Sequence, residues 1–318
     1  MKIKILIIFG TRPEAIKMCP LVKELKRREN IDVSVCVTAQ HREMLDQVLT
    51  AFDIIPDFDL SVMKTSQTLS GLTGIILEKI SSVIQLVKPD FVLVHGDTTT
   101  AFASALSAFY NQIPVGHVEA GLRTHNLYSP VPEEFNRQAI SLISTLHFSP
   151  TDNAYKNLIM EGKNKETIIV TGNTAIDALK TTVKENYNND DLNWSAGSRL
   201  VFVTVHRRES LGEPMRSIFK AIRRVVDENP EIKVIYPVHL NPVVKKLANE
   251  ILGGHDRIRL TNPLDVFDCH NIMSRCSVIL TDSGGIQEEA PALGKPVLVL
   301  RNTTERPEGV EAGTLKVV

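Results

Sequence analysis

Three carboxylates stand where predicted strands end or where the next helix begins. Asp97 follows the apolar run VLVHG, Glu119 follows IPVGHV, and Glu133 lies in SPVPEEFNR. Open α/β sheets build their sites at the carboxyl ends of strands, so these acids are expected to converge there. Burial raises the pKa of a carboxyl group, and an ionised neighbour separates the pKa values of two such groups. The three acids therefore predict proton-transfer chemistry.

Structural roles are open alternatives for two of these acids. Asp97 is of the residue type that caps a helix, here one beginning at Thr98. Glu133 suits the first helical turn after Pro132, where a negative charge is favourable. Capping by Asp97 is compatible with catalysis. For Glu119 we find no comparable structural role.

The turn GTRPE after the first apolar run predicts an anion site. Gly10 permits a tight turn, Pro13 suits the first helical position, and Arg12 with Lys17 adds positive charge near a helix start. A tight turn with solvated charges is the alternative. The sequence has neither a Walker A loop nor G-x-G-x-x-G, so neither an ATPase nor a dinucleotide enzyme is supported.

The turn TDSGGIQEEA predicts a diphosphate site more strongly. Amides of three residues at this helix start can cradle the phosphates: Ser283, Gly284 and Gly285. One turn further, Glu288 or Glu289 can accept hydrogen bonds from the hydroxyls of a ribose. An ordinary helix capped by Asp282 or Ser283 is the alternative, but it explains the glycine pair poorly.

Cationic residues follow two other predicted strands. His206, in HRRES, can donate to a phosphate or transfer a proton, although a single histidine is more often structural. Arg301 and Arg306, in LRNTTERPE, either add charge toward the phosphates or lie at the surface.

Short apolar runs alternate with helical patterns along the whole chain, which indicates parallel β-α-β units. The predicted strands are 4–9, 32–37, 91–94, 115–118, 146–148, 167–170, 200–204, 233–236, 258–260, 277–280 and 296–300. Helices are predicted at 14–28, 42–52, 69–87 and 98–110, and Lys184 to Ser198 is expected to be a surface connection. The fold class is α/β, with two doubly wound Rossmann-like domains, 1–171 and 172–318, facing a central cleft.

Composition narrows the function. The 36 Lys and Arg balance the 37 Asp and Glu, and no basic run interleaves with aromatics, so no nucleic-acid partner is expected. The apolar start is too short for a signal peptide, and no later run approaches a membrane span, which predicts a cytoplasmic protein with no membrane contact. The four cysteines contain no C-x-x-C pair, so we expect reduced thiols, no metal and no cofactor.

Motifs along essentially the whole chain resemble the non-hydrolysing UDP-N-acetylglucosamine 2-epimerases. They stand in this order: GTRPEAIK, TAQHRE, HGDTTT, GHVEAGLRT, PEEFNR, HRRES, PVHLNP, TDSGGIQEEAP and TTERPEG. The resemblance implies the two-domain (GT-B-like) fold of many nucleotide-sugar glycosyltransferases. It also implies an isomerase that interconverts UDP-N-acetylglucosamine and UDP-N-acetylmannosamine for surface polysaccharide biosynthesis.

The resemblance implies elimination of UDP from C1 as the C2 proton is removed, followed by re-addition after protonation on the opposite face. The residues matching the family's catalytic groups are Asp97, Glu119, Glu133 and His206. Those matching its UDP ligands are Arg12, Lys17, Ser283, Gly284, Gly285, Glu289 and Arg306. Which carboxylate takes the proton is left open by the sequence.

Bacterial members bind a second UDP-N-acetylglucosamine as an activator, and the family usually forms homodimers. Five residues match or stand at activator positions: Gln40, Glu43, Glu134, Arg207 and His239. Ser66 occupies a place where some members carry Arg, and Cys269 one where relatives often have an aromatic that flanks the uracil. The sequence ends at Val318, before the terminal helices of relatives, so the second domain is expected to lack them.

Other functions remain open. One is a hydrolysing epimerase that releases free N-acetylmannosamine and UDP. Another is a non-catalytic UDP-sugar binding form, suggested by the short C-terminus. A glycosyltransferase of the same fold is a third alternative, supported only by the fold.

Overall fold

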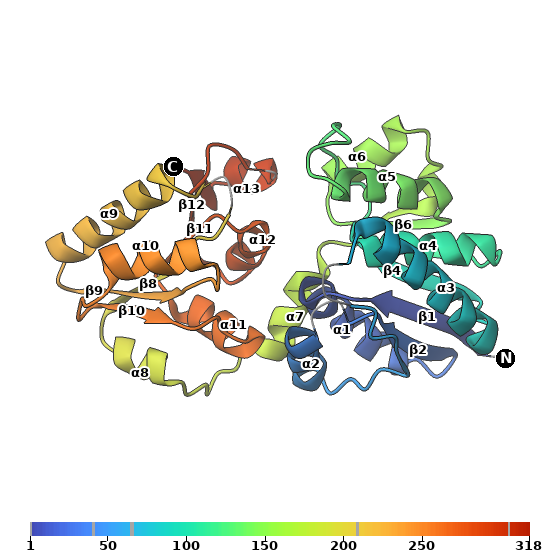
Figure 1. Ribbon diagram of the computed structural model, residues 1–318, viewed down its shortest axis with the longest axis horizontal. Coiled ribbons are helices and arrows are strands. Elements are labelled where there is room, and N and C mark those ends of the chain that lie inside the picture. Colours follow the sequence, from blue (N-terminus) through green and yellow to red (C-terminus); the bar gives the residue numbers. More distant parts are fainter. Residues whose placement is uncertain (1, 40–41, 64–66, 208–209, 305) are drawn as a thin grey trace. The chain divides into compact units, whose positions relative to one another are not determined.

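The chain forms two compact units, each built on its own sheet (Figure 1). The computed structural model describes residues 2–39, 42–63, 67–207, 210–304 and 306–318, without the side chains of 42–44. Unit 1 is Met1–Ala178 and unit 2 is Leu179–Val318. The division lies inside helix α7 (Thr174–Thr182), a few residues after the one expected from the sequence.

Unit 1 has a seven-stranded parallel sheet in the order β3-β2-β1-β4-β5-β6-β7. Its strands are β1 (Ile3–Phe9), β2 (Ile31–Val37), β3 (Phe58–Asp59), β4 (Phe91–His95), β5 (Val115–Val118), β6 (Leu146–Ser149) and β7 (Ile168–Val170). Its helices are α1 (Arg12–Lys26), α2 (Arg42–Ala51), α3 (Leu69–Val87), α4 (Thr99–Tyr110), α5 (Glu133–Ile143), α6 (Asp152–Met160), the short 3-10 helix η1 (Lys165–Thr167) and the start of α7. The six strands predicted for this half are confirmed, and β3 is an addition too short to show a pattern.

Unit 2 has a six-stranded parallel sheet in the order β10-β9-β8-β11-β12-β13. Its strands are β8 (Arg199–Thr204), β9 (Ile232–Pro237), β10 (Ile258–Thr261), β11 (Val278–Thr281), β12 (Val297–Val299) and β13 (Leu315–Val317). Its helices are α8 (Asp190–Ser195), α9 (Glu213–Glu228), α10 (Pro242–Leu252), α11 (Val266–Arg275), α12 (Gly284–Ala292) and α13 (Pro307–Glu311). The segment expected to be a plain connection contains α8, because Asn189 caps it by accepting from two of its amides.

Both sheets are doubly wound, as predicted, and each has a point where the strand order reverses. In unit 1 the chain leaves β1 toward β2 and β3 and later returns to β4 on the other side. In unit 2 the same reversal separates β8 from β11. Loops diverge at such a switch point and leave a crevice at the carboxyl ends of the strands. The loops after β4, β8 and β11 carry Asp97, His206 and Ser283, and the helices that follow β1 and β11 begin at Arg12 and Gly284.

Side chains of the central strands belong to hydrophobic cores on both faces of each sheet. On β1, Leu6 and Ile8 are buried in one core while Ile7 and Phe9 are buried in another. Successive strand residues point to opposite faces, so a strand covered on both faces must be apolar throughout. This explains why the predicted strands read as continuous apolar runs.

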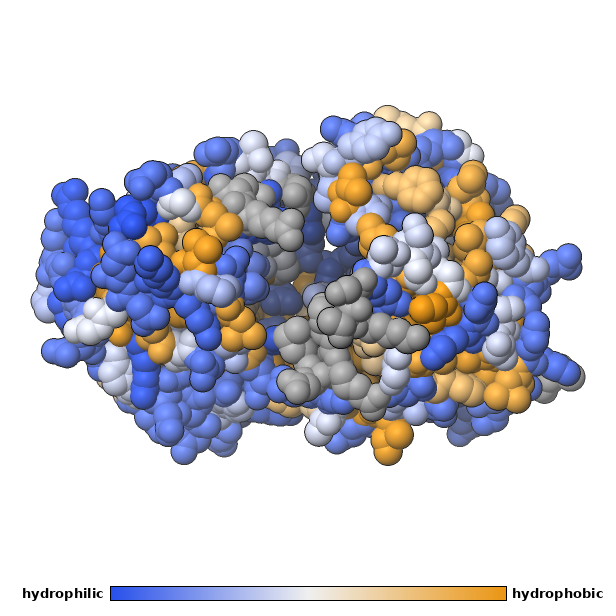
Figure 2. Space-filling model, viewed as in Figure 1, coloured by the Kyte–Doolittle hydropathy of each residue, from blue (hydrophilic) through white to orange (hydrophobic). Residues whose placement is uncertain are grey.

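Helix α3 corrects one expectation from the sequence. With a mean hydropathy of 1.3 over its most apolar stretch, it is long and apolar enough to cross a membrane. Five of its residues are buried, and they belong to the core that includes β1, β4 and α4: Leu72, Ile76, Ile80, Val83 and Ile84. Packing against the sheet and α4 accounts for that face of the helix. Other apolar side chains of unit 1 remain exposed, and the face in Figure 2 shows them gathered more densely there than on unit 2.

Gly116 on β5 lies in a tightly packed part of this sheet. A Cβ at Gly116 would lie 2.6 Å from Phe91 and 2.7 Å from Leu93, and it would also press on Phe148. We expect Gly116→Ala to lower the free energy of unfolding by about 1–3 kcal/mol, because overpacking displaces its neighbours. Urea unfolding followed by circular dichroism measures this.

Gly74→Ala is the matched control. Gly74 lies within α3 and has open space where its Cβ would be, so alanine is expected to stabilise the helix by roughly 0.5–1 kcal/mol. Equal effects of the two substitutions would contradict the packing described for β5.

Candidate functional site

The three acids predicted to converge do so in unit 1. Asp97 follows β4, Glu119 directly follows β5, and Glu133 is the first residue of α5. The pKa of Asp97 is raised, chiefly by burial and further by the negative charges of Glu119 and Glu133, against the opposing charge of Arg137. Each of the other two carboxylates thus acts electrostatically on Asp97. The arrangement can hold a proton on one acid while another stays ionised.

The capping role considered for Asp97 belongs to its neighbour. Thr98 is the N-cap of α4, and its hydroxyl accepts from the amide of Ala101 at 3.0 Å. The Asp97 carboxylate instead accepts from Arg137, with Nη2 and Oδ2 separated by 2.5 Å. Because the Asp97 carboxylate does not cap α4, it is available for proton transfer.

Arg137 is a residue that the sequence reasoning missed. It lies one helical turn after Glu133 on α5 and also pairs with Glu134 at 3.2 Å. The signal was present in PEEFNR, since residues three and four apart on a helix share a face. Its charge lowers the pKa of Asp97 and opposes the effect of burial.

Glu119 has an unusual backbone for its residue type. Its φ is 64°, in the left-handed region that non-glycine residues rarely adopt. Its carboxylate pairs with Lys17 from α1, and His95 Nε2 lies 3.7 Å from Oε2. Such strain persists only where surrounding contacts impose it, and it gathers at functional sites. The structure therefore strengthens the interpretation of Glu119 as a functional residue.

A buried carboxylate shapes the GTRPE turn that carries Arg12. Glu14 accepts from the amides of Gly10 at 3.0 Å and Thr11 at 2.7 Å, and from the Thr98 hydroxyl at 2.6 Å. Gly10 is required there because a Cβ would lie 2.0 Å from the Thr38 hydroxyl. The glycine thus allows the protein's own side chains to approach, and Glu14 ties the loop after β1 to the loop after β4.

Two buried histidines, His95 and His117, lie beside the loop that carries Asp97. His117 on β5 lies 2.7 Å through Nε2 from the carbonyl oxygen of Gly96, and donates to it in its neutral Nε2–H form. Burial lowers the pKa of His117 to about 3 and that of His95 to about 4. Both rings are therefore neutral near pH 7.

In unit 2, His206 and the Ser-Gly-Gly turn follow the two strands that flank the switch point. His206 Nδ1 lies 3.5 Å from Oδ1 of Asp282, which is fully buried. Ser283 occupies the N-cap position of α12, but its own amide donates to the Thr281 hydroxyl at 2.9 Å. Gly284 and Gly285 begin the helix, where the first amides have no partner within the helix.

The two other predicted UDP ligands of unit 2, Glu289 and Arg306, lie on α12 or pair with it. Arg306 pairs with Glu288, and Glu289 lies 3.4 Å from Nε2 of the buried His270. Arg301 lines a pocket at the end of β12 together with Ser210 and Leu300.

The predicted activator residues are only partly described. Gln40 and Ser66 lie outside the described residues, and the side chain of Glu43 is not described. Glu134 is fully buried and accepts from the amides of Thr124 and His125, both at 3.1 Å. In this structure Glu134 therefore anchors the loop before α5.

His239 and Arg207, the other two activator candidates, lie beside His206. The His239 ring stacks on that of His206, with centroids 5.4 Å apart and planes 12° from parallel. The Arg207 amide donates to Asp282 at 2.8 Å.

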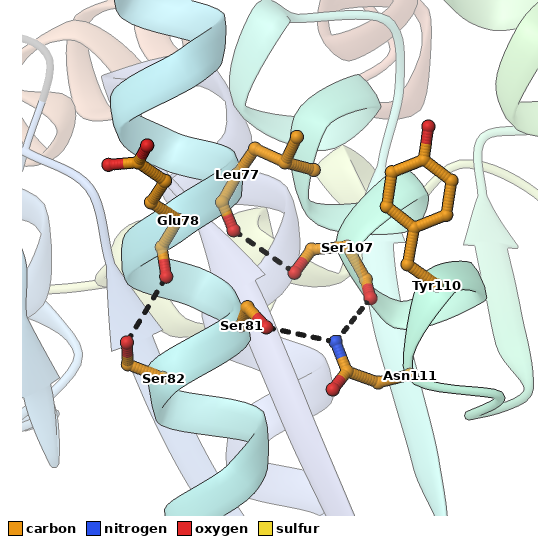
Figure 3. Close-up of a pocket in the computed structure, with 7 residues that line it drawn as sticks. All are labelled: Leu77, Glu78, Ser81, Ser82, Ser107, Tyr110 and Asn111. Atoms are coloured by element: carbon orange, nitrogen blue, oxygen red, sulfur yellow. Dashed lines mark hydrogen bonds between the residues drawn. The ribbon is translucent and has the colours of Figure 1, made fainter.

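A pocket between α3 and α4 contains none of the predicted site residues (Figure 3). Its polar atoms already bond one another: Asn111 Nδ2 donates to the Ser81 hydroxyl at 3.1 Å, and Ser107 donates to the Leu77 carbonyl at 3.2 Å. In the part of the chain that is described, no group of three or more His, Cys, Asp or Glu could hold a metal ion. The four cysteines are free, and only Cys269 is not fully buried.

The fold and site define a two-unit α/β protein with an acid cluster at one switch point and a glycine-rich helix start at the other. A family profile described as UDP-N-acetylglucosamine 2-epimerase matches residues 23–318. A Bacillus subtilis protein named UDP-N-acetylglucosamine 2-epimerase is 60% identical over 316 residues, which cover 99% of this chain and 83% of that protein.

Solved structures agree. An S. aureus MnaA–UDP co-structure has a TM-score of 0.92 at 57% identity, covering 100% of this chain and 84% of that one. A UDP-GlcNAc 2-epimerase from Neisseria meningitidis bound to UDP-GlcNAc has a TM-score of 0.90 at 48% identity, covering 99% and 87%. The chain belongs to the UDP-N-acetylglucosamine 2-epimerase family.

Replacing Arg137 tests the electrostatics of the acid cluster. In Arg137→Gln the pKa of Asp97 is expected to rise further, because the neighbouring positive charge that favours the ionised carboxylate is lost. Carbon-13 NMR of labelled aspartate across a pH titration measures this, with Asp97 assigned from Asp97→Asn. Arg28→Gln, which removes an exposed pair with Glu24, is the control. An unchanged or lower Asp97 pKa in Arg137→Gln would contradict the role of this arginine.

The buried histidines predict a pH dependence of stability. The pKa of His117 falls from 6.5 to about 3 on folding, so below pH 6.5 the unfolded chain binds more protons than the folded one. The free energy of unfolding should then decrease as pH falls from about 6.5 toward 4, by up to ~1.4 kcal/mol per pH unit for each such histidine. In His117→Gln, the free energy of unfolding, measured by urea unfolding at several pH values, should decrease less steeply as pH falls. A slope equal to that of the parent protein would count against the neutral, buried form of His117.

Proposed function

We propose that this chain interconverts UDP-N-acetylglucosamine and UDP-N-acetylmannosamine by inverting C2 of the sugar. The observation that carries the proposal is the cluster of Asp97, Glu119 and Glu133 at the switch point of unit 1, in a chain that belongs to this family. The UDP and UDP-GlcNAc named in the related structures support a UDP-sugar as the substrate.

The acid cluster suits removal and return of one proton. A carboxylate takes the C2 proton as the C1–O bond to UDP breaks, which gives a glycal and free UDP. A protonated acid then delivers a proton to the opposite face of C2, and UDP re-adds at C1. The raised pKa of Asp97 suits an acid that holds a proton, while Glu119 beside Lys17 suits the ionised partner.

Unit 2 supplies the groups for the leaving diphosphate. Negative charge develops on UDP as the C1–O bond breaks, and helix amides and cations stabilise such charge. The amides of Gly284 and Gly285, with His206 and Arg306, suit this role, and the cations Arg12 and Lys17 have the charge that it requires. Glu289 suits the ribose hydroxyls. Residues 1–171 thus form the acid/base domain of the proposal and 172–318 its nucleotide domain.

The proposal extends to the assembly and its regulation. The enzyme acts as a cytoplasmic homodimer that feeds surface polysaccharide synthesis. A second UDP-N-acetylglucosamine activates it through Arg207 and His239, with Glu134 shaping the loop before α5. The stacking of His239 on His206 supports this, because it joins a proposed activator residue to a proposed catalytic one.

Hydrogen exchange at C2 tests the reaction. In deuterated water, UDP-N-acetylglucosamine should acquire deuterium at C2 in both epimers, read by proton NMR and mass spectrometry. Asp97→Asn should slow the exchange by about 10²–10⁴-fold, the usual contribution of a general acid or base. Asp32→Asn, an exposed carboxylate on β2, is the matched control and should leave the rate unchanged.

The same experiment separates the rival functions. Free N-acetylmannosamine with stoichiometric UDP would indicate a hydrolysing epimerase instead. Binding of the nucleotide sugar without exchange in the parent protein would indicate a non-catalytic binding form and would overturn the proposal.

A further inference from the structure

Asp282 lies directly after β11 and is completely buried. Its Oδ2 accepts from the amides of His206 at 2.9 Å and Arg207 at 2.8 Å, and from the Ser210 hydroxyl at 3.3 Å. All three donors belong to the loop after β8. The sequence suggests Asp282 as a cap of α12, but its carboxylate is turned toward this neighbouring loop.

The second oxygen of Asp282 faces the His206 ring. Oδ1 lies 3.5 Å from Nδ1 of His206 and has no hydrogen-bond partner among the described residues. A buried carboxylate oxygen without a donor costs about 1–3 kcal/mol or more. A proton on Nδ1 of His206 would satisfy it, after a small approach of the ring.

The surroundings of His206 leave this proton under competing influences. On balance the pKa of His206 is lowered, chiefly by burial and further by the neighbouring His239 and Arg207, against the negative charge of Asp282, which raises it. Among the described residues, these three groups act electrostatically on the ring: one is a carboxylate, and two are cationic or can become so. Asp282 is therefore the one group among them that favours a proton on the ring.

We propose that Asp282 is a positioning residue that fixes His206 as the Nδ1–H tautomer and stabilises its imidazolium form. The other ring nitrogen, Nε2, is then the one that exchanges protons with a ligand. A carboxylate that holds one nitrogen of a histidine sets the tautomer and orientation in this way. The part of the inference that concerns catalysis rests on the proposed function.

In that reaction the proton balance is simple. With Nδ1–H held by Asp282, protonated His206 donates its Nε2 proton to a diphosphate oxygen as the C1–O bond breaks. Neutral His206 remains, with Nε2 as an acceptor. When UDP re-adds at C1, Nε2 takes that proton back, so the histidine ends as it began.

The test is the tautomer of His206, read from its ring nitrogens by long-range ¹H–¹⁵N NMR on protein labelled at histidine. His206→Gln identifies the signals. In the parent protein above the His206 pKa, the Nδ1–H form is expected, and finding the Nε2–H form would overturn the proposal. This measurement needs no variant at position 282.

Asp282→Asn then tests the cause. An amide in this position donates to Nδ1, so His206 should change to the Nε2–H tautomer and its pKa should fall. An unchanged tautomer in a folded Asp282→Asn protein would overturn the proposal, even if C2 exchange were lost. The control is Asp227→Asn, which removes an exposed carboxylate 3.0 Å from His255 and should leave the His206 signals unchanged.

C2 exchange links the tautomer to catalysis. Asp282→Asn should lower the exchange rate by about 10- to 100-fold, the usual cost of losing a residue that orients a functional histidine. If the parent protein itself shows no exchange, the proposed function fails while the NMR result still decides the role of Asp282.

Discussion

Buried carboxylates that bind neighbouring loops are the interaction on which both sites depend. At each switch point two loops diverge from adjacent strands, and nothing in the strand pairing holds the loops together. In unit 1, Glu14 in the first turn of α1 accepts from two amides of the loop after β1 and from the hydroxyl of Thr98 after β4. In unit 2, Asp282 after β11 bonds the loop after β8. Each acid gives buried amides the partners that they need.

A buried carboxylate also holds the long segment before α5. Glu134 accepts two amides of the segment before α5 while Arg137 connects it to Asp97. Burial raises the pKa of Glu134, but hydrogen bonds from Gln138 and the Thr124 amide, with the charge of Arg137, lower it on balance. The carboxylate therefore stays ionised and can hold several donors at once. These bonds therefore fix the arrangement of the acid cluster, although the loops beside it have little regular secondary structure.

Local patterns predicted the strands because most of them are covered on both faces and must be apolar throughout. They missed β3, which has two residues, and β13 at the end of the described chain. They also missed α8, although Asn189 before two acids is a recognisable helix start. Strands β3 and β13 form because they pair with neighbouring strands, which a window along the sequence does not contain.

The strand-end rule was sufficient to bring Asp97, Glu119 and Glu133 together, but not to assign partners. Asp97 and Thr98 are both capping residue types, and only the backbone path decides that Thr98 caps α4. Asp282 likewise fits the pattern of a helix cap, yet its side chain turns to a loop about 75 residues away in the sequence. Side-chain direction depends on tertiary packing, so these roles required the structure.

Because Glu119 has a left-handed backbone, selection for stability and selection for activity favour different residues at this position. A non-glycine residue in this conformation costs roughly 1–2 kcal/mol relative to glycine, which adopts it freely. A library at this position sorted for thermal stability alone would be drawn toward glycine, whereas sorting for turnover would retain the acid. Under the proposed function, the acid at position 119 serves the chemistry at a cost in backbone conformational energy, so a substitution there that stabilises the fold would lower the activity.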